Sequence, residues 1–273
     1  MAKGNDGNLL QHEVELRLAT RLAGLGSGRL HLALTHGMAP YEPCDRPRAA
    51  VAHDRLDGVL KSLAGEPGPE ETPLVRAYRT CAATREHYPN SAELIASLIG
   101  RENVEGCITE TDPVKFEELA AAWAGTHVHV RQGSWRREVG EGGGLRCPVD
   151  LDRPWLLSMD PLTWQEDEAA AEVGGADDAH LHPGDLRRIE DLLRDYVASG
   201  QPGAASIFVY QVPPPLQSTF WLRMTSLARE LDVRGHGHAA DHDDEARNLA
   251  AEQLLTGGYV SDGLRSFSYT HLR

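Results

Sequence analysis

The sequence predicts an α/β fold built on a doubly wound, mostly parallel sheet. Apolar segments of strand length alternate with amphipathic helical patterns along the chain. The strand segments are almost continuously apolar, which is typical of parallel strands that are covered on both faces. The 273 residues suit one large domain. We therefore expect a single domain over residues 1–273, with a helical insertion over residues 42–87.

In the first half of the chain, Leu9, Val14, Leu18 and Leu22 recur at helical spacing, and Gly24 can end that helix. Residues 46–72 are acidic, contain Gly and Pro and lack a period, so one short helix is expected there. The elements expected in this half are a helix over residues 8–24, a strand over 29–35, the insertion, and a helix over 91–100 capped by Ser91.

The second half continues the alternation. Asp112 and Pro113 are typical of a helix start, and Phe116, Leu119 and Trp123 share one face of that helix. The expected elements are strands over residues 104–109, 127–131, 153–160 and 205–212, and helices over residues 112–123, 182–200 and 216–231.

The composition is that of a globular protein without membrane-spanning segments. Hydrophobic residues make up 41% and charged residues 25%, as in globular proteins generally, and no apolar run reaches membrane-spanning length. The start of the chain lacks the pattern of a signal peptide, so a cytoplasmic location is expected. The cysteines are far apart and predict reduced thiols without a zinc site: Cys44, Cys81, Cys107 and Cys147.

The net charge of −14 disfavours binding to nucleic acid. The most basic stretch contains Arg131, Arg136, Arg137, Arg146 and Arg153, interleaved with acids and glycines. The segment with His236, His238, Asp241, His242 and Asp243 could suggest a metal, but it lacks a ligand spacing. We expect it to be a solvated polar loop, and we expect no metal site.

Distinctive residues follow four predicted strands: Thr35-His36-Gly37, Glu110, Gln132-Gly133 and Ser158-Met159-Asp160-Pro161. In an open parallel sheet, ligands bind beyond these carboxyl ends, near the topological switch point. The first helix is preceded by a polar run, "GNDGNLLQH", which is richer in Asn, Gln and His than a capping turn requires.

These motifs, in this order over residues 4 to 212, resemble the bacterial family of large-subunit ribosomal RNA adenine-N6 methyltransferases. That family has the class I S-adenosylmethionine (SAM) methyltransferase fold, which is Rossmann-like. The matching segments are "GNDGNLLQH", "LTHGMAPYE", "YPNSA", Glu110-Thr111-Asp112-Pro113, Gln132-Gly133 and Asp160-Pro161-Leu162-Thr163.

The resemblance implies roles for these residues. Glu110 would accept the ribose hydroxyls and Gln132 would contact adenine, while the remaining cofactor contacts would come from Thr35, His36, Asn8, Gln11, Gly133, Ser158 and Pro161. Asp160, Asn5 and His12 would act at the reacting group, with the N-terminal segment closing over it as a lid. The alternatives are a helix-start acid for Glu110, a solvated amide for Gln132, a packed histidine for His36, a turn cap for Asp160 and a simple capping turn for the N-terminus.

Two motifs depart from the family. A glycine-rich first loop is replaced by Met38-Ala39-Pro40, where Pro40 removes an N–H donor. Leu162 and Thr163 stand where the family has a second proline and an aromatic residue that stacks on the base. The first departure means either that the pocket is reshaped or that SAM binding is lost, and the presence of Thr35 and His36 favours a reshaped pocket. The second departure indicates that base recognition is lost.

We therefore expect a SAM-dependent enzyme that acts on a small molecule or on SAM itself. It would do so by methyl transfer or by another use of the sulfonium, such as cyclisation to azetidine-2-carboxylate with release of methylthioadenosine. Adenine-N6 methylation of RNA or DNA is the first alternative, and a non-catalytic partner protein is the second. Nucleic-acid and membrane partners are not expected, and the chain is expected to be a monomer or homodimer.

Overall fold

The computed structural model describes residues 6–25, 28–44, 54–69, 71–138, 154–160, 163–164, 180–198, 204–211, 237–241 and 265–272. The helices are α1 (Asp6–Leu25), α2 (Asp54–Ser62), α3 (Pro73–Thr80), α4 (Ser91–Ile99), the short 3₁₀ turn η1 (Arg101–Asn103), α5 (Pro113–Ala122), α6 (Trp135–Glu138) and α7 (Pro183–Ala198). The strands are β1 (Leu30–Leu34), β2 (Tyr41–Glu42), β3 (Tyr88–Pro89), β4 (Val104–Glu110), β5 (His127–Gln132), β6 (Trp155–Met159), β7 (Thr163–Trp164), β8 (His180–Leu181), β9 (Ala204–Gln211), β10 (Gly237–Asp241) and β11 (Arg265–Leu272).

The main sheet has the strand order β10-β11-β9-β6-β1-β4-β5. Strands β9, β6, β1, β4 and β5 run parallel, whereas β11 is antiparallel to both β9 and β10. The chain winds outward from β1 through β4 to β5, then returns to β6 and winds outward the other way. The predicted α/β class is confirmed, and the direction of winding reverses beside β1, which is the topological switch point.

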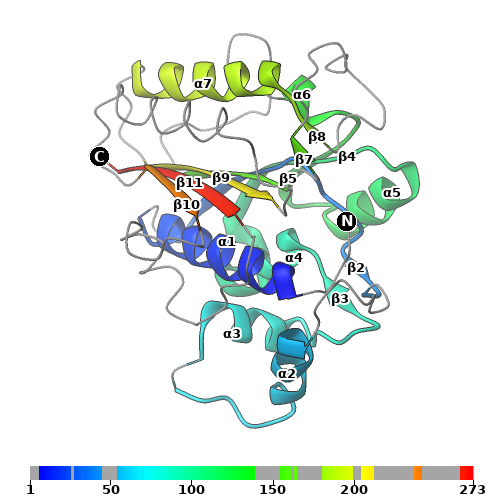
Figure 1. The fold of residues 1–273 in the computed structure, drawn as a ribbon. Coiled ribbons are helices and arrows are strands. Elements are labelled where there is room, and N and C mark those ends of the chain that lie inside the picture. The colour runs from blue at the N-terminus through cyan, green and yellow to red at the C-terminus, as the bar shows by residue number, and fades with distance from the viewer. Residues whose placement is uncertain are drawn as a thin grey trace.

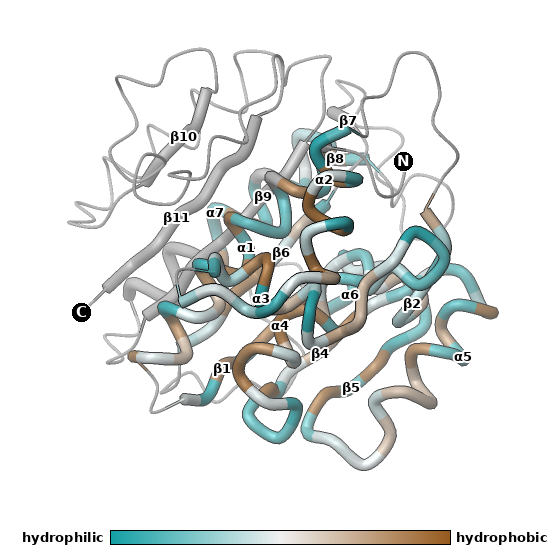
Figure 2. The backbone as a smooth tube through the Cα atoms, turned by 90° about the horizontal axis from the view of Figure 1, so that it is seen from below, coloured by the Kyte–Doolittle hydropathy of each residue, from teal (hydrophilic) through white to brown (hydrophobic). Residues whose placement is uncertain are grey.

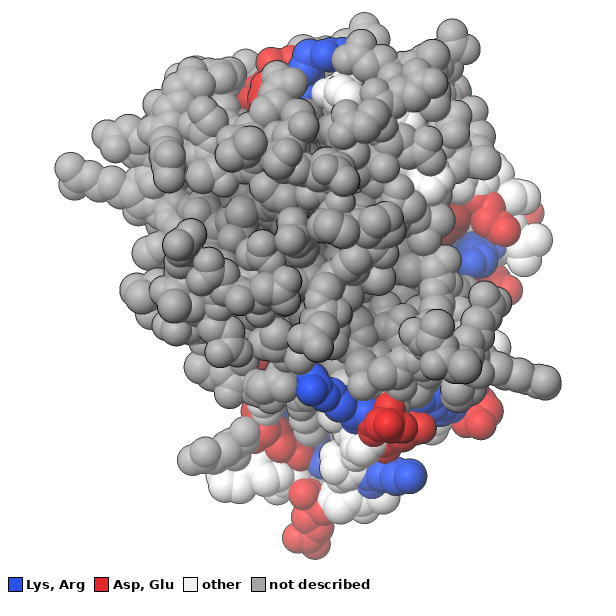
Figure 3. Space-filling view, viewed as in Figure 1, with Lys and Arg blue, Asp and Glu red and all other residues white. Residues whose placement is uncertain are grey.

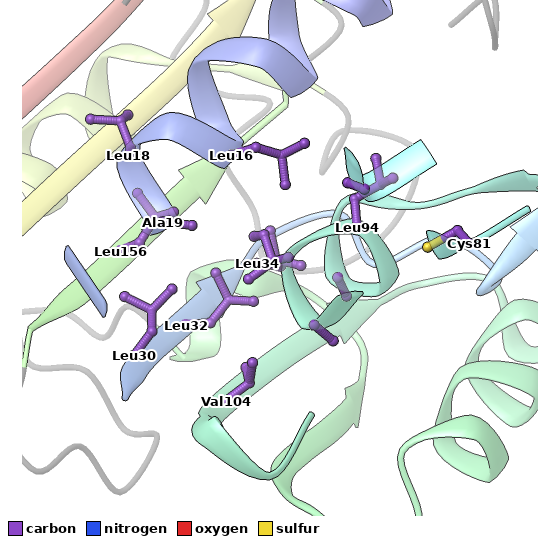
Figure 4. Packing of buried hydrophobic residues seen from close by; sticks show 14 of the residues in the cluster. Leu16, Leu18, Ala19, Leu30, Leu32, Leu34, Cys81, Leu94, Val104 and Leu156 are labelled. Carbon is purple, nitrogen blue, oxygen red and sulfur yellow. The ribbon is translucent and has the colours of Figure 1, made fainter. Parts of the chain in front are cut away.

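Helices cover both faces of this sheet (Figure 1). Helix α7 lies on one face, and α1 lies on the other, where it packs against α3 and α4. All five residues of β1 are buried. Side chains of β1, β6, β4, α1 and α4 meet in one apolar cluster (Figure 4), which holds the central strands and α1 in fixed positions.

Helix starts depend on polar caps. Asp112 accepts hydrogen bonds from the backbone N–H groups of Val114 (2.9 Å) and Lys115 (3.2 Å), and Pro113 occupies the first turn of α5, as predicted. Along α5 hydrophobic and hydrophilic residues alternate (Figure 2), as in a helix with one face on the sheet. The predicted cap of α4 was wrong: Asn90, not Ser91, accepts from the N–H of Glu93.

Helix α2 is the one short helix predicted over residues 46–72, whereas α3 follows that stretch, at a place where no element was predicted. Helix α3 was missed because it follows a stretch rich in Gly and Pro, although Thr72 caps it by accepting from Val75 N–H. Strands β2 and β3 pair antiparallel on either side of these helices, with Glu42 opposite Tyr88. The segment therefore begins and ends at neighbouring points beside β1, and its boundaries at residues 42–87 stay a prediction.

Charged residues of both signs gather over α2 and α3, at the lower end of the face in Figure 3. Two ion pairs belong to this region, Arg79 with Glu71 (2.5 Å) and Arg85 with Asp57 (2.6 Å). Such exposed pairs contribute about 1 kcal/mol or less to stability. None of the described helices is long and apolar enough to cross a membrane.

The last part of the sheet corrects one expectation. Residues 237–241 form β10, which pairs with β11, whereas the sequence predicted a polar loop there. A five-residue strand that contains Gly, His and Asp has no apolar alternation from which to predict it. The predicted helix over residues 216–231 lies outside the described residues.

Candidate functional site

The carboxyl ends of β1, β4, β5 and β6 lie side by side. Leu34 is in register with both Ile108 and Ser158, and Glu110 is in register with Gln132. Just beyond β1, the N–H of Thr35 donates to the Ser158 carbonyl (3.1 Å). The four strand ends singled out in the sequence are thus neighbours at the switch point.

Thr35 and His36 directly follow β1 as a hydrogen-bonded pair. Thr35 Oγ1 lies 2.7 Å from His36 Nδ1, and Thr109 Oγ1 donates to the Thr35 carbonyl (2.8 Å). Thr35 is buried, while His36 is partly exposed. These bonds fix the direction in which the His36 ring leaves the strand.

The loop after β1 uses its own amides internally. The N–H of Gly37 donates to the Thr109 carbonyl (2.7 Å), that of Met38 to Glu110 Oε2 (2.7 Å), and that of Ala39 to Glu42 Oε1 (3.2 Å). Met38 has a φ of 57°, which is rare for a residue with a side chain. The loop therefore differs from one that turns free amides toward a ligand.

Gly37 is required by packing within the chain. A Cβ at this position would lie 2.6 Å from a methyl of Leu119 and 2.7 Å from one of Ile108. Asn90 supports the same loop, since its Nδ2 donates to the carbonyl of Gly37 (2.9 Å). The loop is thus held between β4, α5 and the start of α4.

Glu110 ends β4 and is largely buried. Its Oε2 accepts from Met38 N–H (2.7 Å) and its Oε1 from Asp112 N–H (2.8 Å). Each carboxylate oxygen has two lone pairs, so each keeps one for a further donor. Glu110 joins the β1 loop to the start of α5 and can still accept hydrogen bonds from a ligand.

Gln132 and Gly133 end β5. Gln132 is exposed, and the Gly133 N–H donates to the Glu110 carbonyl (2.9 Å). Gly133 has a φ of 126°, a conformation that favours glycine. Both residues therefore lie beside Glu110.

The first turns of α1 bring polar side chains to the end of β6. Asn8 donates to Gln11 Oε1 (3.3 Å), and Gln11 is buried and hydrogen-bonded to Asp160. Asn5 and Pro161 lie outside the described residues. The structure thus brings Gln11 and Asp160 together. Of the N-terminal segment that was expected to act as a lid, the structure describes only the part that belongs to α1.

His12 faces the other helices of this layer. Its Nδ1 lies 2.9 Å from the Tyr78 hydroxyl and 3.4 Å from that of Tyr88, and the two hydroxyls are 2.6 Å apart. Burial lowers the pKa of His12 to about 3, so the ring is neutral at physiological pH. In this arrangement His12 ties α1 to α3 and β3.

Asp160 follows β6 and carries a buried carboxyl oxygen, Oδ1, that has no hydrogen-bond partner. Burial raises the pKa of Asp160 to about 7; Gln11 opposes this by a hydrogen bond, and the negative charge of Glu15 adds to it. A carboxyl group with such a pKa exchanges its proton readily near neutral pH, as a general base or acid must.

Sequence reasoning missed Glu15 and Asn90. Ser158 Oγ donates to Glu15 Oε1 (2.6 Å), so the site contains a second buried carboxylate. Glu15 occupies a buried position of α1, where the helical pattern predicts an apolar residue. A charged residue at such a position could have indicated a functional role. Asn90 is of a residue type that caps helices, but no sequence pattern predicts its second contact, which is with the loop after β1.

No protein-family model matches this chain, and a search of curated proteins finds no match. Among solved structures, the chain is similar to protein LPL1258 of Legionella pneumophila str. Philadelphia 1, from the family designated DUF519. The two are 16% identical with a TM-score of 0.54, over 84% of this chain and 75% of that one. This likeness shows the fold.

A DUF574 family protein from Streptomyces avermitilis MA-4680 is also similar, at 12% identity over 97% of this chain and 83% of that one. Its TM-score of 0.36 is too low to support an argument. The fold is thus Rossmann-like α/β, as predicted, and the assignment to the adenine-N6 methyltransferase family is not confirmed.

Proposed function

We propose that this chain is a SAM-dependent enzyme that acts on a small molecule, with its reacting centre between the end of β6 and the start of α1. The observation that carries the proposal is the Asp160 carboxyl at the switch point of a Rossmann-like sheet. One of its oxygens, Oδ1, is buried without a hydrogen-bond partner, and its pKa is raised to about 7.

The residues present fit the nucleoside end of SAM. Glu110 ends the strand next to β1, and each of its oxygens retains a lone pair for a ribose hydroxyl. Gln132, in register with Glu110, offers an amide that can accept from the adenine amine and donate to a ring nitrogen. A bound nucleoside would then span the ends of β4 and β5.

The methionine end of SAM requires other partners. The N–H groups of Gly37, Met38 and Ala39 already donate to protein acceptors, so these three amides of the β1 loop are not free to bind a carboxylate. The polar side chains of α1, including Asn8 and Gln11, border the same edge of the sheet beside Asp160. We therefore place the methionine end against α1.

SAM supplies an electrophilic carbon on a sulfonium, and the chain's part is to orient a nucleophile and take its proton. Asp160 is the described group with the position and proton affinity for that task. Gln11 holds the carboxyl in place by its hydrogen bond. Because burial raises its pKa, the carboxyl is a stronger base than an exposed one once it ionises.

The test is to incubate the purified protein with SAM and identify the products by mass spectrometry. S-adenosylhomocysteine would indicate methyl transfer, and methylthioadenosine would indicate another use of the sulfonium. Formation of either product should fall by about a hundredfold in Asp160→Asn. Calorimetry should first show that the wild type binds SAM, and a protein that binds no SAM at millimolar concentration would refute the proposal.

A further inference from the structure

We propose that Glu15 and Asp160 together bind a cationic amine, and this inference rests on the proposed function. The amine is either the α-ammonium group of SAM itself or the ammonium group of a second substrate. Both sources present the same chemistry to the site, a positively charged nitrogen with several N–H donors. The resemblance does not imply that either carboxylate binds a cation. It implies only that Asp160 accepts from a neutral aromatic amine.

Two contacts between α1 and the end of β6 define the site. Gln11 and Glu15 are four residues apart, so they lie on one face of α1. Ser158 and Asp160 are two residues apart at the end of β6. Gln11 is hydrogen-bonded to Asp160, and Ser158 Oγ donates to Glu15 Oε1 (2.6 Å). The helix and the strand thus hold the two carboxyl groups next to each other.

Each carboxyl group keeps one buried oxygen without a partner. These atoms are Glu15 Oε2 and Asp160 Oδ1, and Glu15 is 0% exposed. A buried carboxylate without a counter-charge costs several kcal/mol. No Lys or Arg side chain in the described part of the chain pairs with either of them, and the opposing positive charge that lowers the pKa of Asp160 is that of the N-terminal amino group. A ligand that brings a positive charge would satisfy both oxygens at once.

The proton affinities of the two groups agree with this arrangement. Burial raises the pKa of Glu15, an effect that hydrogen bonds from Ser158 and Ser91 partly offset, and burial also raises the pKa of Asp160. Without a ligand, both carboxyl groups therefore keep their protons to a higher pH than exposed carboxyl groups do. An ammonium group would favour the ionised carboxylates and displace those protons into solvent.

The experiment compares SAM with methylthioadenosine, which lacks the α-ammonium group. Calorimetry at pH 8 measures the affinity of each ligand for the wild type, for Glu15→Gln and for the control Glu13→Gln. Gln keeps the size of Glu15 and can still accept from Ser158, so the variant should fold. Glu13 is equally buried on the same helix but forms an ion pair with Arg17. Melting temperatures check folding in every variant.

If SAM provides the amine, Glu15→Gln should weaken SAM binding at least tenfold and leave the affinity for methylthioadenosine unchanged. Fewer protons should also be released when SAM binds, as measured in two buffers of different ionisation enthalpy. Glu13→Gln should match the wild type in both ligands.

If a second substrate provides the amine, SAM affinity should be equal in all three proteins. Propylamine then serves as the probe: at millimolar concentration it should raise the melting temperature of the SAM-saturated wild type and of Glu13→Gln, but not that of Glu15→Gln. Equal SAM affinity and an equal response to propylamine in all three proteins would overturn the inference. A wild type that binds no SAM would instead refute the proposed function.

Discussion

At the scale of single residues, the titrations of Asp160 and His12 make stability depend on pH in opposite directions. The carboxyl of Asp160 ionises near pH 7 in the fold and near its ordinary value of 3.8 in the unfolded chain. Between these two pH values the folded state holds a proton on Asp160 that the unfolded chain has released. The free energy of unfolding therefore falls as pH rises through that range. His12 is neutral in the fold and charges below its ordinary pKa of 6.5 only when the chain unfolds, so its contribution is lost as pH falls.

Asp160→Asn removes the first of these effects. We expect its melting temperature to equal that of the wild type near pH 4 and to exceed it increasingly up to about pH 7. The gain is at most about 4 kcal/mol, from a shift of about three pKa units at 1.36 kcal/mol each. Calorimetric melting at several pH values provides the measurement, and a constant difference between the two proteins would mean that Asp160 ionises normally.

The same substitution should damage function while it improves stability. Turnover of SAM by Asp160→Asn should fall by about a hundredfold, the lower range for loss of a proton acceptor. SAM affinity should change little if the amine comes from a second substrate. A variant that is more stable but inactive would support a catalytic role for Asp160. If Asp160 were only a turn cap, the variant would be less stable and fully active.

At the scale of elements, Asn90 connects the start of α4 to the loop after β1. Its Oδ1 accepts from Glu93 N–H (2.9 Å), and its Nδ2 donates to the Gly37 carbonyl (2.9 Å). Asn90→Ala should cost about 2–3 kcal/mol, because both a helix cap and a buried hydrogen bond are lost. Thr72→Ala is the matched control, since Thr72 only caps α3, and it should cost about 1 kcal/mol.

Chemical denaturation of the two variants checks this expectation. Because Asn90 also positions the loop beside Glu110, Asn90→Ala should weaken SAM binding as well, whereas Thr72→Ala should not. Equal losses of stability in both variants would show that Asn90 acts as a cap alone.

The elements that the sequence predicted well are those with a clear period or a clear cap. The long helix α1 and the buried strands β1, β4 and β6 belong to this group, as does α5 with Asp112 and Pro113 at its start. Two-residue strands such as β2 and β3 are too short to show a hydrophobic period. They form because the segments before α2 and after α3 pair with each other. Contacts that join distant segments, such as Glu15 with Ser158, depend on packing that no local pattern encodes.

At the scale of the whole molecule, net charge limits the partners. With a formal charge of −14, the chain should bind nucleic acid weakly at physiological salt. We expect no retardation of protein-free ribosomal RNA in a gel shift at 150 mM salt and micromolar protein, and no methylation of that RNA with SAM present. Robust methylation under these conditions would support adenine-N6 methylation in place of a small-molecule reaction.

The strand order places the candidates at the ends of β1, β4, β5 and β6 side by side, which the sequence predicted from the alternation of strands and helices. The resemblance supplied the roles, and the structure brought Glu110, Gln132, Ser158 and Asp160 to neighbouring strand ends. It also showed that the β1 loop uses its own amides, a departure that Met38 and Pro40 had indicated. Asn5 and Pro161 stay predictions.

The central claim is that SAM binds at the carboxyl edge of this sheet with its ribose on Glu110. Calorimetry with SAM should be done on the wild type, on Glu110→Gln and on the control Glu117→Gln, which alters an exposed acid of α5. Loss of charge-assisted hydrogen bonds worth about 1.5–3 kcal/mol predicts that Glu110→Gln binds SAM at least tenfold more weakly. Glu117→Gln should bind SAM as the wild type does. An unchanged dissociation constant for a folded Glu110→Gln protein would contradict the account.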